Sequence, residues 1–245
     1  MRKSTKSIEW LKARPIAHRG LHDSERGVLE NTRTAFDLAI SGNYTIECDL
    51  QISTDGEAMV FHDPNLARLT TGKEDVNQLT AAQLQEVSFR DTSDKIQTLA
   101  ELLQQTNGRV PLVIEIKSLV DGDMTIAQRT LEVLSSYTGD YAIMSFAPML
   151  MQTIKNQSPQ TLRGGVVGPK TENLWLQTSG KGETVLDTID LDFVSYDVRG
   201  LPSAFVDNFR SPTKPVISWT IKDQKTADFA QKYCDQITFE GFTPK

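Results

Sequence analysis

Short apolar runs and stretches with helical spacing alternate along most of this chain of 245 residues. An apolar run of about four to eight residues predicts a buried strand, and apolar positions that recur roughly every three to four residues predict a helix. The predicted strands are a run from residue 15 that ends at 18–20, and residues 44–53, 110–116, 141–146, 162–167, 193–196, 215–219 and 236–239. The predicted helices are a segment that starts at 31–32 and stops at Gly42, and residues 98–105, 125–137, 148–156, 203–209 and 224–233, with a helical or irregular segment within 173–186.

Each predicted strand except the last is followed by a helical stretch, which implies parallel strands joined by right-handed crossovers. Eight such units in about 250 residues match the size of a (β/α)8 barrel, and an open, doubly wound sheet is the second choice. Residues 57–62 predict a short strand that returns from a tight turn, and residues 64–97 are mostly polar, with one amphipathic piece at 79–87. We therefore expect an α/β TIM barrel, one domain over residues 1–245, with a small insertion at about 64–97 after the second strand.

Acidic and basic residues lie on two of the predicted strands with a spacing of two. Glu47 and Asp49 share one face of their strand, and Glu115 and Lys117 repeat that spacing near the end of another, because successive side chains on a strand point to opposite faces. Three carboxylates from neighbouring strands would form an all-oxygen site of the kind that suits Mg²⁺ or Ca²⁺. A layer of salt bridges with Lys117 and Arg19 would satisfy the same carboxylates without a metal ion.

Active sites of barrels lie at the carboxyl ends of the strands, where further polar residues fall in this chain. His18 and His62 follow predicted strands, and histidine changes charge near neutral pH, so the pair could act as acid and base. Arg19 supplies paired N–H donors that match a phosphate, and Lys117 supplies a point charge. Acids for a hard cation, bases for an anion and histidines for protons together indicate metal-assisted phosphoryl chemistry.

Composition narrows the class of protein. The net charge of −6 argues against a general nucleic-acid binder, which needs a basic surface. There is no apolar run long enough for a membrane-spanning helix, and the basic first fifteen residues lack the apolar core of a secretory signal, so we expect a cytoplasmic protein. Cys48 and Cys234 are too few for a disulfide framework and are expected to be buried, reduced thiols.

A series of motifs adds to this picture: His18-Arg19-Gly20, Glu30-Asn31-Thr32 with Ala35-Phe36, Ile46-Glu47-x-Asp49, Thr54-Asp55-Gly56, His62-Asp63 with Leu66-x-Arg68-x-Thr70, Leu99-x-Glu101-Leu102-Leu103, Glu115-x-Lys117, Ser145-Phe146 and Trp219-Thr220. In this order they resemble the signature of the glycerophosphodiester phosphodiesterase family. The resemblance is continuous over roughly the first half of the chain and becomes sparser after Phe146.

The resemblance implies a (β/α)8 barrel with a small insertion after the second strand, and hydrolysis of glycerophosphodiesters to glycerol 3-phosphate and an alcohol. It also implies site residues. A divalent metal ion, Mg²⁺ or Ca²⁺, would be held by Glu47, Asp49 and Glu115. The acid–base pair would be His18 and His62, the phosphate would lie on Arg19 and Lys117, and Trp219 would line the pocket near the organic portion of the substrate. The substrate partner would be a small molecule, without stable membrane insertion.

The sequence leaves alternatives open. A lysophospholipase D-like enzyme for lipid substrates would use the same site, and a phosphoester-binding barrel without turnover would share the fold. Trp219 could instead be a packing residue at a barrel rim. The chain also departs from the family, since many members end the last strand in Thr-Asp whereas this chain reads Thr238-Phe239-Glu240, and a shift of one residue turns a side chain to the other face. The headgroup, the identity of the metal, the nucleophile and the oligomeric state stay undetermined at this point.

Overall fold

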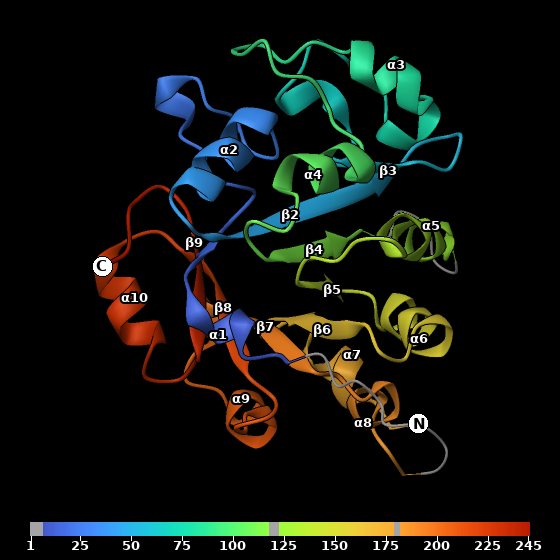
Figure 1. Cartoon of the computed structure of the whole chain (residues 1–245). Coiled ribbons are helices and arrows are strands. Elements are labelled where there is room, and N and C mark those ends of the chain that lie inside the picture. Colours follow the sequence, from blue (N-terminus) through green and yellow to red (C-terminus); the bar gives the residue numbers. More distant parts are fainter. Residues whose placement is uncertain (1–6, 118–122, 179–181) are drawn as a thin grey trace. The chain divides into compact units, whose positions relative to one another are not determined.

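The computed structural model describes residues 7–117, 123–178 and 182–245. Its elements fall into two compact units, one formed by Ala17–Tyr141 and the other by the residues up to Ile16 together with Ala142–Lys245. In both units parallel strands alternate with helices along the chain, as Figure 1 shows. This is the arrangement of a (β/α)8 barrel, so the predicted fold class is confirmed. The single domain over residues 1–245 stays a prediction.

The unit Ala17–Tyr141 is built around strand β2 (Thr45–Ile52), which is buried over nearly its whole length. Strand β4 (Leu112–Ile116) pairs with β2 in parallel, and the short strand β3 (Ala58–Val60) pairs with it antiparallel, as the predicted return strand requires. The other elements are β1 (Ile16–Ala17), which spans the boundary between the units, the 3-10 turns η1 (Ser24–Arg26), η2 (Leu66–Arg68) and η3 (Val76–Gln78), and the helices α2 (Arg33–Ser41), α3 (Ala81–Glu86), α4 (Leu99–Thr106) and α5 (Thr125–Leu134).

Local sequence signals explain where these helices begin. The Thr32 side chain accepts a hydrogen bond from the Ala35 backbone N–H and caps α2. Thr98 and Glu101 form a reciprocal capping box at the start of α4, a pairing that satisfies two backbone N–H groups otherwise left without partners. Both helices also bury an apolar face. Capping sets where each helix begins, and burial holds α2 in place before β2 and α4 in place after β3.

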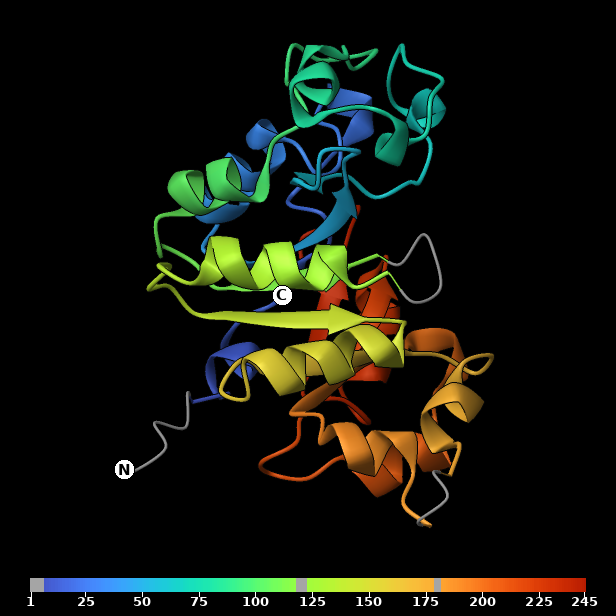
Figure 2. The same cartoon turned by 90° about the vertical axis from the view of Figure 1, so that its right-hand side faces the viewer.

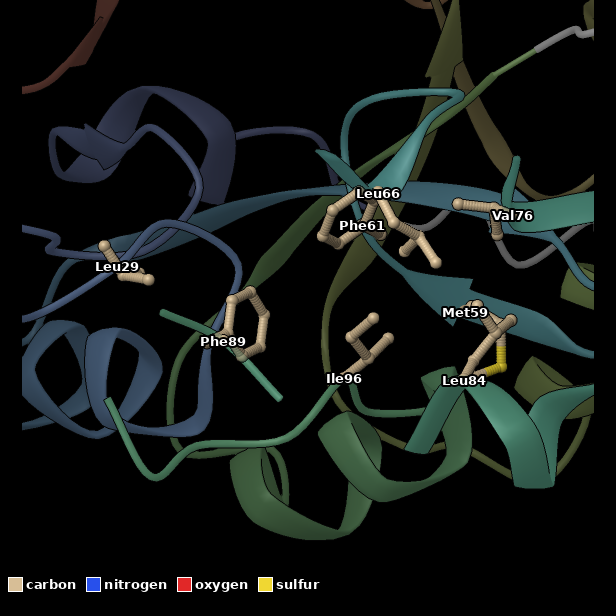
Figure 3. Packing of buried hydrophobic residues seen from close by; sticks show 8 residues of the cluster. All are labelled: Leu29, Met59, Phe61, Leu66, Val76, Leu84, Phe89 and Ile96. Carbon is tan, nitrogen blue, oxygen red and sulfur yellow. The ribbon is translucent and has the colours of Figure 1, made fainter. Parts of the chain in front are cut away.

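A small hydrophobic cluster joins the insertion to neighbouring elements of the unit Ala17–Tyr141. Residues 64–97 contain only short helical turns joined by irregular stretches, which Figure 2 shows in teal and green at the top of the view. Phe61 lies with its ring centroid 6.4 Å from that of Phe89. Figure 3 shows the cluster that holds the insertion to the barrel, which consists of Leu29, Met59, Phe61, Leu66, Val76, Leu84, Phe89 and Ile96. The insertion is therefore a packed segment, and its bounds of about 64–97 stay a prediction.

The second unit continues the alternation of strand and helix. Its strands run in the order β5-β6-β7-β8-β9, and β5 to β9 pair with one another in parallel. Its elements are α1 (Trp10–Ala13), β5 (Tyr141–Ser145), α6 (Pro148–Gln157), β6 (Leu162–Val167), α7 (Glu172–Leu176), α8 (Val185–Ile189), β7 (Phe193–Asp197), η4 (Val198–Gly200), α9 (Ala204–Phe209), β8 (Val216–Ile221), α10 (Gln224–Ala230) and β9 (Gln236–Phe239). The segment expected to be helical or irregular within 173–186 contains α7 and the start of α8, and its residues 179–181 lie outside the described part of the chain. Helix α1 has no counterpart in the prediction.

The two cysteines are both buried, and neither forms a disulfide in the described part of the chain, as predicted. Cys48 lies in β2 between Glu47 and Asp49, on the opposite face of the strand from the two carboxylates. Burial raises the pKa of the Cys48 thiol well above its usual value, and the charges of Glu47 and Asp49 raise it further. Among residues 7–117, 123–178 and 182–245, no helix has the length and apolar character that crossing a membrane requires.

Candidate active site

Three buried carboxylates converge where β2 and β4 run side by side. Glu47 and Asp49 leave the same face of β2, and the parallel register places Asp49 opposite Glu115 on β4. One carboxylate oxygen of each residue lies within 4.8 Å of one from each of the other two. Glu47 and Asp49 are each only 1% exposed, so water contributes little to holding their charge. The convergence predicted from the two-residue spacing is therefore present in the structure.

Two cations neutralise part of this charge. Lys117 Nζ lies 2.8 Å from Asp49 Oδ1, and it also bonds the Glu115 carboxylate. Arg19 Nε lies 3.3 Å from Asp49 Oδ2, and the Arg19 backbone N–H donates to Glu47 Oε2 over 2.9 Å. The salt-bridge layer that the sequence left open as an alternative is thus formed around Asp49. Three carboxylates against two cations leave a formal excess of one negative charge.

The pKa shifts show where that excess charge falls. Burial alone would raise the pKa of Asp49, but Lys117 and Arg19 outweigh it and hold the pKa well below its usual value. Burial raises the pKa of Glu47 well above its usual value, and the charges of Asp49 and Glu115 add to the effect. Burial also raises the pKa of Glu115, although Lys117 opposes it. Asp49 is the well-stabilised anion, and Glu47 is the carboxylate for which burial and the neighbouring acids outweigh the charges of Arg19 and Lys117.

A divalent cation fits this arrangement of donors. Glu47 Oε1 is buried and makes no hydrogen bond to any described residue, although a buried acceptor is normally paired. All three side chains offer oxygen, the ligand type that Mg²⁺ and Ca²⁺ prefer, and the excess charge is negative. The acidic cluster can therefore hold a metal ion, and the unpaired oxygen marks the side on which the ion would bind.

The loop after β1 positions Arg19 through a tight turn. Arg19 adopts a left-handed φ of 56°, and the next residue, Gly20, has a φ of 81°. A Cβ at Gly20 would lie 2.9 Å from the Cβ of Ala35, so only glycine allows α2 to pack this closely against the loop. The Gly20 backbone N–H donates to the Ala17 carbonyl over 3.3 Å across the turn, and the Asn31 backbone N–H donates to the Arg19 carbonyl over 2.9 Å and ties the loop to the start of α2. The Arg19 N–H is thereby aimed at Glu47.

Asn31 also holds the central carboxylate directly. Its side-chain amide donates to Asp49 Oδ2 over 2.9 Å, and its Oδ1 accepts from the Asp49 backbone N–H over 3.3 Å. Asn31 itself has a left-handed φ of 55°, a conformation that asparagine tolerates better than most residues. Sequence reasoning placed Asn31 only at a helix start and in a family motif, and the motif was the one signal that could have pointed to a role in the site.

The two predicted acid–base residues lie beside this cluster. His18 Nε2 is 4.0 Å from Glu47 Oε2. His62 follows β3, and its Nδ1 lies 2.7 Å from Asp63 Oδ1. Burial lowers the pKa of His62, and the opposing charge of Asp49 does not reverse the shift, so the imidazole is neutral at pH 7. Because an ionised carboxylate can only accept, Nδ1–H donates to Asp63 and Nε2 keeps a free lone pair.

The position of His62 is fixed at the backbone as well. The Phe61 backbone N–H donates to the Asp49 carbonyl over 3.0 Å. The Gln51 side chain donates to the His62 carbonyl over 2.7 Å. These two contacts tie the residue that carries the imidazole to β2, the strand that carries the carboxylates. The unit Ala17–Tyr141 therefore contains all the predicted site residues except Trp219, namely His18, Arg19, Glu47, Asp49, His62, Glu115 and Lys117.

Trp219 belongs to the other unit, on β8. Its indole Nε1 donates to the Ser195 carbonyl over 3.1 Å, and its ring meets Phe146 edge to face at a centroid distance of 5.7 Å. Both rings line a cavity of about 420 Å³ together with Gly168, Pro169, Lys170, Thr171, Asp197 and Arg199. Trp219 is thus partly a packing residue and partly a cavity wall, and its contact with substrate stays a prediction.

Comparison with known proteins agrees with this site. The model of the glycerophosphoryl diester phosphodiesterase family matches residues 18–238. The Bacillus subtilis protein YhdW, a candidate glycerophosphodiester phosphodiesterase, is 24% identical over 221 residues, which cover 86% of this chain and 87% of that protein. A glycerophosphodiester phosphodiesterase of Caldanaerobacter subterraneus is 29% identical over 159 residues, which cover 61% of this chain and 64% of that protein.

Among solved structures, a phosphodiesterase from Oleispira antarctica in complex with its product sn-glycerol-3-phosphate superposes with a TM-score of 0.79. The two sequences are 22% identical, and the superposition covers 94% of each chain. At this level of identity the likeness shows the shared barrel fold.

Proposed function

Because the chain belongs to the glycerophosphoryl diester phosphodiesterase family, we propose that it hydrolyses glycerophosphodiesters to glycerol 3-phosphate and an alcohol. The observation that carries the proposal is the cluster of Glu47, Asp49 and Glu115, in which the buried Glu47 Oε1 makes no hydrogen bond to a described residue and His18 Nε2 lies 4.0 Å from Glu47 Oε2. Sites of this composition stabilise charge on a phosphoryl group while a neighbouring side chain moves a proton.

We propose that the three carboxylates hold one divalent ion, Mg²⁺ or Ca²⁺. When bound, the ion supplies positive charge to the phosphoryl oxygens. Arg19 and Lys117 have a double role in this proposal. They keep Asp49 ionised, and they add fixed positive charge on the side of the site where the phosphate binds.

The histidines move the protons. His62 Nε2 accepts the proton of the attacking hydroxyl, because Asp63 holds the other proton of the ring on Nδ1. The new P–O bond forms as the bond to the alcohol breaks, and His18 gives its proton to the departing alkoxide. Water is the attacking group in direct hydrolysis, and the neighbouring hydroxyl of the glycerol moiety is the attacking group if a cyclic phosphate forms first.

The substrate partner in this proposal is a small molecule, and Trp219 contacts its organic portion. Lys170 and Arg199 line the same cavity as Trp219, and Arg199 pairs there with Asp197. The expected cytoplasmic location stays a prediction.

The test is an assay of glycerol 3-phosphate released from glycerophosphocholine by the purified protein, in the presence of Mg²⁺ or Ca²⁺ and after treatment with a chelator. We expect release with the ion, loss of release with the chelator, and recovery when the ion is added in excess. No release from any glycerophosphodiester under these conditions would contradict the proposed activity, and release that the chelator leaves unchanged would contradict the metal site.

A further inference from the structure

The insertion contributes an arginine to the edge of the site. Arg68 ends the 3-10 turn η2, and its guanidinium binds two carboxylates at once. Nε and Nη2 lie 2.5 and 3.1 Å from Asp63 Oδ2 and Oδ1, while Nη1 and Nη2 lie 3.0 and 2.7 Å from Glu30 Oε2 and Oε1. Paired N–H contacts of this kind fix direction as well as supply charge.

Both carboxylates lead onward to residues of the site. Asp63 accepts from Nδ1 of His62, and Glu30 Oε1 also accepts from Nη1 of Arg19 over 2.7 Å. Arg19 in turn contacts Asp49. One guanidinium on the insertion thus connects the carboxylate that orients His62 with the carboxylate that orients Arg19.

The insertion holds Arg68 rigidly at its base. Leu66, at the start of the same turn, is fully buried in the hydrophobic cluster, next to Phe61 in Figure 3. The Leu66 carbonyl accepts from the Thr70 hydroxyl over 2.8 Å, and the Asn65 side chain accepts from the Ala67 backbone N–H over 2.9 Å. The backbone that carries Arg68 is therefore anchored, although the Arg68 side chain itself is 46% exposed.

We propose that Arg68 is a positioning residue for the reaction, and that the insertion serves to present it: its guanidinium fixes the Asp63 carboxylate against Nδ1 of His62. This inference rests on the proposed function and adds a residue that touches neither the substrate nor the metal ligands. Asp63 alone has rotational freedom about its side-chain bonds, so the carboxylate would turn toward water in the absence of Arg68. With the guanidinium in place, only one orientation satisfies both partners.

The charge of Asp63 supports the same inference. Burial would raise the pKa of Asp63, but the hydrogen bonds from Arg68 and then from His62 outweigh it and lower the pKa. An ionised Asp63 can only accept, which keeps the His62 proton on Nδ1 and leaves Nε2 facing away from Asp63. Partners that orient a metal-bound histidine are typically worth about 10- to 100-fold in activity, and we expect an effect on this scale for the contacts that orient His62.

The experiment compares Arg68→Gln and Arg68→Lys with the matched control Arg129→Gln. Arg129 is also a partly exposed arginine of the same unit that binds two carboxylates, Glu57 and Glu132, and it lies outside this network. We expect Arg68→Gln to lower kcat by about 10- to 100-fold with little change in KM. Arg68→Lys, which keeps the charge but cannot form both paired contacts, should fall between Arg68→Gln and wild type. Arg129→Gln should match wild type.

A second measurement reads the positioning directly. The chain has only three histidines, so ¹⁵N NMR of the imidazoles at pH 8 resolves His62, assigned from the resonance that disappears in His62→Ala. Wild type should show the tautomer protonated at Nδ1, and Arg68→Gln should move toward the Nε2-protonated form that free histidine prefers. Wild-type kcat in Arg68→Gln, an equal loss in Arg129→Gln, or an unchanged tautomer would each overturn the proposal.

Two further outcomes remain interpretable. If Arg68→Gln does not fold, Arg68→Lys provides the same comparison of kcat and tautomer. If the wild-type protein does not hydrolyse glycerophosphodiesters, the proposed function fails, and the tautomer of His62 in the variants alone decides whether Arg68 positions it.

Discussion

Replacing Glu47 by glutamine should change the stability of the protein in opposite directions with and without a metal ion. In the metal-free protein the pKa of Glu47 is raised, first by burial and then by Asp49 and Glu115. A carboxyl with a raised pKa stabilises the fold while it is protonated, and that stability is lost as the pH rises through the raised pKa. The side-chain amide of the E47Q variant cannot ionise, yet it keeps an oxygen that can accept from the Arg19 N–H. We therefore expect metal-free E47Q to unfold at a higher temperature than metal-free wild type at pH 8.

Added metal should reverse this order. An ion that binds only the folded protein contributes about 2.7 kcal/mol to the free energy of unfolding at 100 times its dissociation constant. For a chain of this size roughly 1 kcal/mol corresponds to about 2–4 °C in Tm, so wild type should gain about 5–11 °C. The E47Q variant keeps only two of the three carboxylates, Asp49 and Glu115, and these are already paired with Arg19 and Lys117. Its Tm should therefore rise little when metal is added.

The assay is differential scanning calorimetry at pH 8 on chelator-treated protein, with and without saturating Mg²⁺ or Ca²⁺. Glu57→Gln is the matched control, since it removes a glutamate of the same unit that pairs with Arg129 away from the cluster. It should keep the full metal-induced shift. Equal shifts in E47Q and wild type would refute the metal site. A metal-free E47Q that is less stable than wild type would refute burial and carboxylate repulsion as the origin of the raised pKa.

Three further predictions follow from the site and the insertion. His62→Ala should lower kcat by about 10²- to 10⁴-fold at unchanged Tm, measured on glycerophosphocholine, and near-normal turnover would exclude His62 as a proton carrier. Phe61→Ala should cost about 3–5 kcal/mol in urea unfolding, because it empties space in the core beneath the insertion, and a loss under about 1 kcal/mol would contradict that packing. The pKa values of Glu30 and Asp63 are lowered, because their hydrogen bonds to Arg68 outweigh burial. The two ionised carboxylates therefore stabilise the fold above about pH 4, and this stabilisation is lost as the pH falls through their lowered pKa values. Circular dichroism from pH 7 to 2 should show Arg68→Gln with a shallower acid loss than wild type, and parallel curves would contradict the pairing.

The sequence was sufficient to predict the strands and the carboxylate cluster because both depend on local periodicity. Alternation along β2 places Glu47 and Asp49 on one face, and the parallel pairing of β2 with β4 brings Glu115 beside them. Predicting this convergence requires the strand pattern and the fold class, and no side-chain contact. The strand-end positions and the family resemblance both indicated the histidines, and the structure adds that burial lowers the pKa of His62 and that Asp63 orients its ring.

The contacts around Arg68 could not be predicted in the same way. Asp63, Arg68 and Glu30 lie far apart in sequence or on irregular segments, and their pairing depends on the path of the insertion, which has no period to read. The family motifs contain all three residues, but the motifs do not indicate which side chains pair with one another. For a related reason the sequence predicts only a helical or irregular segment where α7 and the start of α8 lie, because helices of about one turn owe their stability to tertiary packing rather than to propensity.

The thiol of Cys48 gives the site a chemical indicator of its own integrity. Only a thiolate reacts readily with alkylating reagents, and burial together with the neighbouring carboxylates suppresses that form while β2 stays in the sheet. Labelling of Cys48 therefore requires the strand that carries Glu47 and Asp49 to open. The rate of labelling can be followed by mass spectrometry as ions or substrate analogues are added. A slower rate would show that the added molecule stabilises β2 in the sheet against local opening.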